Sequence, residues 1–197
     1  MIALPSAPAP SARRQLLVGT AVACAALAAL LGGMLATWLR MRQQSIDTTG
    51  SWMPDGVEIP LVPANIMLLG FIPIGVFAQW AVYSAKRQDR SHTGLALGLV
   101  ALLGVAVINA QANIYAQMML PASAGAAADG TFNTMFYAIT GVMTVMLVIG
   151  VVFSAITAFR YLGGRTVDRE IVSAHAMYWY FLSFAFAMLW FVVYVTK

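Results

Sequence analysis

The titratable and metal-binding residues of this chain are few, and they lie mostly outside its apolar stretches. The 197 residues include two histidines, His92 and His175, and one cysteine, Cys24. A single cysteine excludes an internal disulfide framework and any site built from several thiolates. The seven acidic residues fall in polar segments or at their edges: Asp47, Asp55, Glu58, Asp89, Asp129, Asp168 and Glu170. The apolar stretches therefore contain no nucleophile–base pair, carboxylate pair or metal cluster.

The two histidines are the residues that could ligate haem or copper. Such ligation needs histidines buried at matching depth and spacing. We expect His92 in a polar loop. We expect His175 about one turn inside the last apolar stretch, as an interfacial histidine bonded to a loop or a lipid headgroup. The sequence thus predicts that the chain has no catalytic residue and binds no metal or cofactor itself.

Neutral polar residues are concentrated in the third apolar stretch, which carries Asn109, Gln111, Asn113 and Tyr115. Asn109 and Asn113 are four residues apart and share a helix face, whereas Gln111 points elsewhere. These side chains could line a polar path or a ligand site. The simpler interpretation is interhelical hydrogen bonding, which in membranes contributes about 0.6 kcal/mol per bond. We therefore expect them to orient helices.

Small residues recur at helical spacing in the first and third apolar stretches. They are Ala21, Ala25, Ala29 and Gly33 in the first, and Gly94 and Gly98 in the third. Small residues let helix backbones approach closely, which matters in lipid, where the hydrophobic effect does not drive helices together. The pattern predicts two helix-packing faces.

Five long segments without Asp, Glu, Lys or Arg must position all these residues. They run from Arg14 to Arg40, Glu58 to Lys86, Arg90 to Asp129, Asp129 to Arg160 and Glu170 to Lys197. Only 9% of the residues are charged, against about 25% in soluble domains. Each segment is long enough to cross a hydrocarbon core as a helix, which takes roughly 20 residues. The sequence predicts an all-α bundle of five transmembrane helices, at about 15–39, 61–85, 93–120, 131–159 and 171–196.

The basic residues predict the orientation of this bundle. Eight fall on one side: Arg13, Arg14, Lys86, Arg87, Arg90, Arg160, Arg165 and Arg169. Arg40, Arg42 and Lys197 fall on the other. The positive-inside rule then places the N-terminus in the cytoplasm and the C-terminus outside. Residues 1–12 read as a disordered cytoplasmic tail, and 13–197 as a single membrane domain. The net charge of +4 comes from basic residues that orient the helices in the membrane, so we expect no nucleic acid partner.

Short motifs in the last three spans resemble subunit III of the haem-copper respiratory oxidases. Residues 134–141 (TMFYAITG) resemble the family's S-x-F-Y-x-x-T-G, and residues 178–183 (YWYFLS) resemble its Y-W-H-F-V-D. Gln111 and Tyr115 stand where the family shows Q-x-x-E-Y. The order and spacing of the motifs agree with the five-helix bacterial form over nearly the whole chain.

The family's titratable positions within the membrane are replaced by neutral residues. The Glu of its first helix falls at Leu27, and the Glu of Q-x-x-E-Y falls at Ile114. The His and Asp of Y-W-H-F-V-D fall at Tyr180 and Ser183. No functional residue is carried over at these positions, which leaves helix packing as the shared element.

The resemblance implies a non-catalytic accessory subunit of a terminal oxidase in the bacterial cytoplasmic membrane. It implies packing on subunit I, in a complex with subunit II, with haem and copper held by subunit I and with phospholipid as a further ligand. Such a subunit steadies the proton-uptake entrance and the lipids through which oxygen enters. Two alternatives remain open: an equivalent subunit of a nitric oxide reductase or another membrane complex, and a small transporter.

Overall fold

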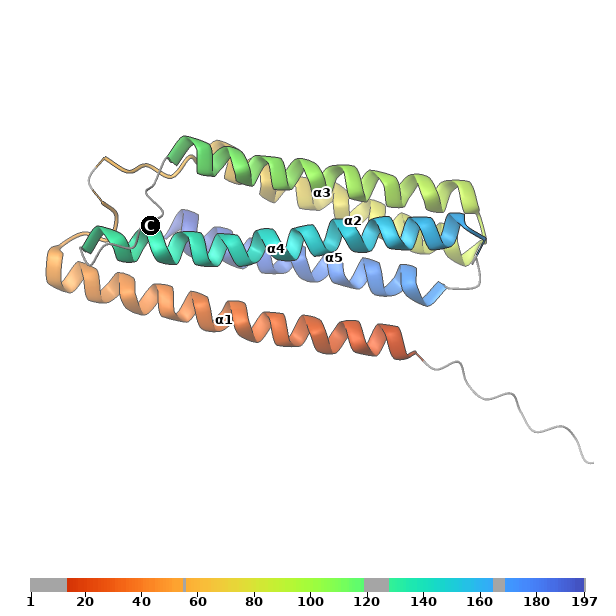
Figure 1. The fold of residues 1–197 in the computed structure, drawn as a ribbon, viewed down its shortest axis with the longest axis horizontal. Helices are drawn as coiled ribbons and strands as arrows, with labels where there is room; N and C mark the ends of the chain where they lie inside the picture. The colour runs from red at the N-terminus through yellow and green to blue at the C-terminus, as the bar shows by residue number, and fades with distance from the viewer. Residues whose placement is uncertain (1–13, 55, 119–127, 165–168, 197) are drawn as a thin grey trace, which may run out of the picture.

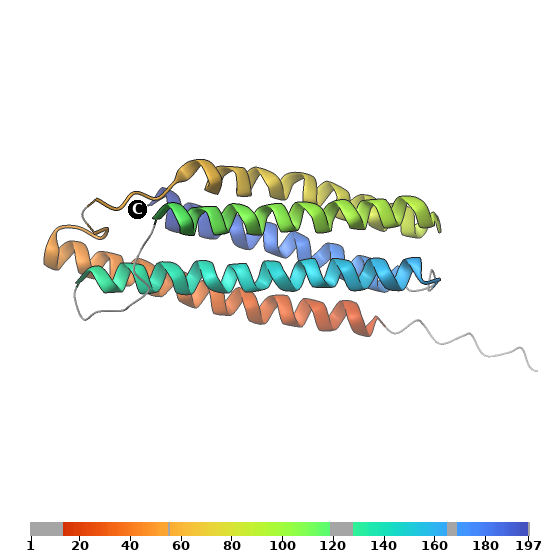
Figure 2. The same cartoon turned by 45° about the horizontal axis from the view of Figure 1, so that its top comes forward.

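A computed structural model describes residues 14–54, 56–118, 128–164 and 169–196, and these form a bundle of antiparallel helices (Figures 1 and 2). The helices are α1 (Gln15–Thr49), α2 (Leu61–Lys86), α3 (Arg90–Met118), α4 (Ala128–Leu162) and α5 (Arg169–Leu189), which η1 (Trp190–Val195) continues as a short π-helix. All five are long and apolar enough to cross a membrane, and the described residues include no strand. The predicted all-α, five-span fold is confirmed. The tail predicted for residues 1–12 lies outside the described residues.

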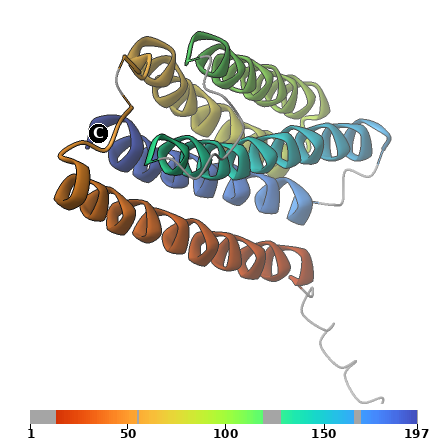
Figure 3. The same ribbon diagram turned by 60° about the vertical axis from the view of Figure 1, so that its left-hand side comes forward.

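Helix α5 lies at the centre of the bundle and contacts α1, α2 and α4, while α3 packs between α2 and α4. Helix α1 is the least embedded element (Figure 3). Only 11% of its apolar stretch is buried inside the chain, against 50% for α5. Most of the α1 surface is therefore left for lipid or for another protein.

Helix α1 is ten residues longer than the sequence predicted, because its end was placed at the end of the apolar stretch. It continues through Arg40 and Arg42 to Thr49. Residues 40–44 are Arg, Met and Gln, which favour helices, so the helix persists beyond the apolar stretch. It stops at Gly50, which adopts φ 80° and donates its N–H to the Ile46 carbonyl. A left-handed residue of this kind is a common helix terminator and favours glycine.

One end of α1 is held by a carboxylate from another helix. The Arg14 side chain, at the N-cap position of α1, makes no capping hydrogen bond. Instead, Glu170 in the first turn of α5 accepts a hydrogen bond of 2.9 Å from the backbone N–H of Leu17. Helix N-termini carry partial positive charge, so this one carboxylate is favourable for both α1 and α5.

The other end of α1 is held by aromatic packing. Trp38, which is fully buried, meets Trp52 edge-on, with ring centroids 5.1 Å apart. Both rings contact Phe132 of α4, at 5.5 and 5.6 Å. This cluster fixes the segment after α1 against the start of α4. The two ends together compensate for the small buried area along the middle of α1.

A membrane-facing groove and a buried polar cluster form the candidate functional site

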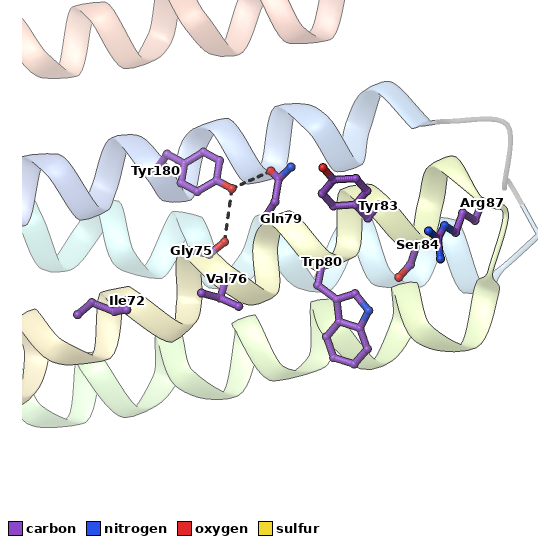
Figure 4. A pocket seen from close by; sticks show the side chains of 9 residues that line it. All are labelled: Ile72, Gly75, Val76, Gln79, Trp80, Tyr83, Ser84, Arg87 and Tyr180. Atoms are coloured by element: carbon purple, nitrogen blue, oxygen red, sulfur yellow. Dashed lines mark hydrogen bonds between the residues drawn. The ribbon is translucent and has the colours of Figure 1, made fainter.

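A groove of about 700 Å³ runs along α2 beside α5 (Figure 4). Its walls are mainly apolar, and it is open on one side. The lining residues from α2 and the turn after it are Ile72, Gly75, Val76, Gln79, Trp80, Tyr83, Ser84 and Arg87, and Tyr180 comes from α5. The groove thus lies where α2 and α5 meet at the surface of the bundle.

The phenol of Tyr180 joins the two helices at the middle of the groove (Figure 4). Its hydroxyl donates to Gln79 Oε1 at 2.8 Å and lies 3.4 Å from the Gly75 carbonyl oxygen. The ring packs on α2 at Gly75, where a Cβ would lie 3.5 Å from Tyr180 Cε1, an ordinary van der Waals distance. The Gln79 amide nitrogen has no hydrogen bond within the described part of the chain. The groove therefore offers an N–H donor at membrane depth.

The end of the groove at the α2–α3 turn is basic. Arg87 lies there, next to the exposed Lys86 (Figure 4). A cationic end, apolar walls and a central amide are complementary to an amphipathic molecule with an acidic headgroup. The guanidinium can bind a phosphate, and the apolar wall can hold an acyl chain.

The turn beside Arg87 is fixed by a capped helix start. Asp89 Oδ1 accepts the backbone N–H of His92 at 3.1 Å, and Asp89 Oδ2 lies 2.6 Å from His92 Nδ1. The hydrogen bond from the His92 backbone is the main reason why the pKa of Asp89 lies below its usual value of 3.8. The His92 ring also packs on Trp80, with centroids 5.9 Å apart. The loop predicted for His92 is wrong, because Asp89 caps a helix that begins at Arg90 and includes this residue in its first turn. From there the His92 ring supports one wall of the groove.

A second polar feature is fully buried between α4 and α5. His175 Nε2 lies 2.7 Å from Ser154 Oγ. The indole N–H of Trp179 is 3.0 Å from both of these atoms. The interfacial placement predicted for His175 is wrong, because its side chain is 0% exposed. The depth along α5 was foreseen, but the ring faces α4 and finds its partner there, as buried polar groups generally do.

Two glycines make room for the Trp179 ring within this cluster. A Cβ on Gly104 of α3 would lie 2.7 Å from Trp179 Cη2, and one on Gly150 of α4 would lie 3.1 Å from Cζ2. The indole therefore fills a gap between three helices that only glycines leave open. Sequence reasoning missed both glycines. The signal that could have found them is that both glycines lie in spans that must pack against an aromatic-rich last helix.

The predicted packing glycines of α3 differ in their surroundings. Gly94 faces α4, and a Cβ there would lie 2.8 Å from Leu162 Cδ2. Gly98 has no atom within 4 Å of its Cβ position. Gly98 therefore packs on no other helix among the described residues. A contact with a second protein remains a prediction.

The small residues of α1 also point away from the bundle. All four are exposed: Ala21, Ala25, Ala29 and Gly33. The buried face of α1 carries larger residues instead, namely Cys24, Leu31 and Trp38. The small face thus lies outside the described bundle, and its packing on a helix remains a prediction. Large side chains fill the space beside α5 better than small ones do, which leaves the small face outside.

The polar residues of α3 divide into two groups. Tyr115 donates a hydrogen bond of 2.8 Å to Thr140 Oγ1 of α4, and the buried Gln111 lies 3.5 Å from the Tyr194 hydroxyl. Asn109 and Asn113 lie on the exposed face, and among the described residues Asn113 accepts a hydrogen bond only from Gln117 of the same helix. The structure thus brings Gln111 and Tyr115 into contact with neighbouring segments but not the two asparagines.

The site as a whole is built for binding and packing. Within the described ranges, no three His, Cys, Asp or Glu side chains come together in a way that could hold a metal ion. The buried His175 bonds through Nε2 to Ser154 Oγ. Its other ring nitrogen, Nδ1, is buried without a partner among the described residues. The contact between His175 Nε2 and Ser154 Oγ joins α4 to α5 here.

Comparison with known proteins identifies the family. Residues 30–197 match the family model for cytochrome c oxidase subunit III. Cytochrome c oxidase subunit 3 of Sus scrofa is 29% identical over 155 residues, and that of Bos taurus is 30% identical over 152 residues. Each alignment covers 75% of this chain and 54% of the relative, so the chain spans about half the length of the curated relatives it matches. The matched region includes every helix from the middle of α1 onward, and the chain belongs to the cytochrome c oxidase subunit III family.

Proposed function

We propose that this chain is a non-catalytic accessory component, of the subunit III type, of a haem-copper terminal oxidase. The observation that carries the proposal is the family match over residues 30–197, which covers the bundle from the middle of α1 onward. Relatives of this chain are named as subunits of cytochrome c oxidase. In this role the haem and copper belong to a partner subunit I, and this chain contributes packing surface to the complex it forms with subunits I and II.

The groove suggests how the chain performs this accessory role. Its apolar wall, the Gln79 amide and the Arg87 guanidinium suit a phospholipid held at the surface of the bundle. A lipid held there would shape the surroundings of subunit I, including the proton-uptake entrance and the apolar path for oxygen. The chain would act by placing that lipid, without moving protons through its own helices.

The proposed location is the bacterial cytoplasmic membrane, with the N-terminus inside. The chain is a multi-pass membrane protein of the oxidase subunit family. The basic residues Lys86, Arg87, Arg90, Arg160 and Arg169 stand at helix ends that lie at one end of the bundle (Figure 1). The positive-inside rule favours the cytoplasm for that end.

The test is purification of the tagged chain in mild detergent, followed by mass spectrometry of the proteins and lipids that accompany it. The proposal predicts stoichiometric recovery of a haem-copper subunit I. Recovery of nitric oxide reductase subunits would keep the family and change the function, and recovery of the chain alone would contradict the proposal. For the lipid, Arg87→Gln is expected to lower the retained anionic phospholipid. Arg40→Gln, a basic residue at the opposite end of the bundle, should not lower it.

A further inference from the structure

The outward face of α3 changes in character halfway along the helix. Exposed residues in its first half include the large side chains Leu95, Leu102 and Val105. Beyond Val105 the exposed residues are all small or amides: Ala106, Asn109, Ala112, Asn113, Ala116 and Gln117. We call these six residues the α3 amide face. No large apolar side chain is exposed there up to Gln117.

Helices α2 and α4 flank α3 and have a different surface. The exposed residues of α2 include large aliphatic side chains along most of the helix: Val62, Ile66, Leu69, Ile72 and Val76. Helix α4 shows the same pattern: Val145, Val148, Ile149, Val152 and Ile156. Surfaces of this kind are compatible with lipid tails. The α3 amide face lacks such a covering, although it belongs to the same bundle.

Asn109 is the residue that lipid accommodates least well. It lies about 28 Å along the helix from Arg90 and about 14 Å from Met118, at 1.5 Å per residue, and is thus inside the span. Its amide is exposed and has no hydrogen-bond partner among the described residues. Lipid tails offer neither donor nor acceptor, so an amide facing them is left unsatisfied. Ala106 and Ala112, about one turn away on either side, would let another backbone approach closely.

We infer that the α3 amide face is covered by a transmembrane helix of another subunit, which hydrogen-bonds to Asn109. The occupant follows from the chemistry: it must bring a polar side chain to membrane depth and approach closely over alanines. That the subunit belongs to the oxidase rests on the proposed function. The exposed face of α1 is also rich in small residues but offers no comparable amide, so it carries no such requirement.

Photo-crosslinking in membranes tests this inference. A photoreactive amino acid replaces Ala112 on the α3 amide face, and in a matched control replaces Val152 on the lipid-compatible face of α4. The intact complex is irradiated, purified and mapped by mass spectrometry. We expect position 112 to crosslink to a transmembrane helix of a subunit that co-purifies stoichiometrically. Position 152 should yield lipid adducts alone.

The outcomes separate this inference from the proposed function. If position 112 crosslinks to a stoichiometric partner that is not an oxidase subunit, the α3 amide face is still an interface with another subunit, but the proposed oxidase function is refuted. An adduct between two copies of this chain, or no protein adduct at 112, overturns the inference whichever complex is recovered.

A second variant gives an independent measure. Asn109→Leu should lower recovery of the partner roughly threefold, the factor that one average interhelical hydrogen bond supplies. Melting of the isolated chain should not change, because Asn109 has no partner within the described residues. Val152→Leu should leave partner recovery unchanged. Equal recovery for the two variants would overturn the inference.

Discussion

Among the described glycines, Gly104 leaves the least room for a Cβ, and replacing this residue by alanine should destabilise the chain. The new Cβ would lie 2.7 Å from Trp179 Cη2 and 2.8 Å from Val151 Cγ2, whereas ordinary contact begins at 3.4 Å. The indole cannot easily move aside, because its N–H bonds to Ser154 and His175 at 3.0 Å. Overpacking of this kind costs about 1–3 kcal/mol.

Gly98→Ala is the matched control, because it lies on the same helix with nothing within 4 Å of its Cβ position. Both substitutions gain the higher helix propensity of alanine, up to about 1 kcal/mol, so their difference isolates the clash. For a chain of this length about 1–3 kcal/mol corresponds to roughly 2–12 °C in melting temperature. We expect Gly104→Ala to melt lower than Gly98→Ala by that amount in thermal unfolding of the detergent-solubilised chain. Equal melting temperatures would refute the role assigned to Trp179.

Three further outcomes are expected. Glu170→Ala removes the carboxylate that accepts the Leu17 N–H, so hydrogen exchange at the start of α1 should accelerate. The acceleration should correspond to the loss of a hydrogen bond to a charged group, about 1.5–3 kcal/mol. Unchanged exchange would show that α1 is held by other contacts. Folding lowers the pKa of Asp89, so its cap on α3 is fully formed above the unfolded pKa of 3.8 and is lost as the pH falls through the lower folded pKa. Hydrogen exchange at the start of α3 should therefore rise in acid. Asp89→Asn should remove that pH dependence. Reporter fusions after Ala85 and after Lys197 should report opposite sides of the membrane, with Ala85 cytoplasmic, and a cytoplasmic reporter at Lys197 would contradict the orientation.

The number of helices was predictable because charge is excluded from hydrocarbon, and that exclusion is visible in the sequence. The end of α1 was not predictable in the same way. A gap in charge marks the membrane boundary, whereas a helix ends where its backbone is capped, which here is Gly50. The predicted and observed helix ends differ by ten residues at the end of α1 and by at most three residues at any end of the other helices, when η1 is counted with α5.

It was harder to predict which neighbour each side chain faces. The small residues of α1 and α3 suggested packing faces, but spacing alone does not tell which side of a helix meets a neighbour. Gly98 is open while Gly104, six residues later, meets an indole. His175 was placed at the right depth on the wrong surface, because its partner Ser154 lies in a different helix and has no signature in the sequence. The groove likewise depends on Tyr180 and Gln79, which are far apart along the chain.

The central claim is that this chain is a non-catalytic member of an oxygen-reducing complex, and haem spectroscopy with oxygen uptake tests it most directly. The complex purified through the tagged chain should show a haem spectrum and consume oxygen. After dissociation of this chain, the haem should remain entirely with the partner subunits. These subunits should still reduce oxygen when they are supplied with electrons. A stoichiometric haem band in the separated chain, or a complex that consumes no oxygen, would contradict the claim.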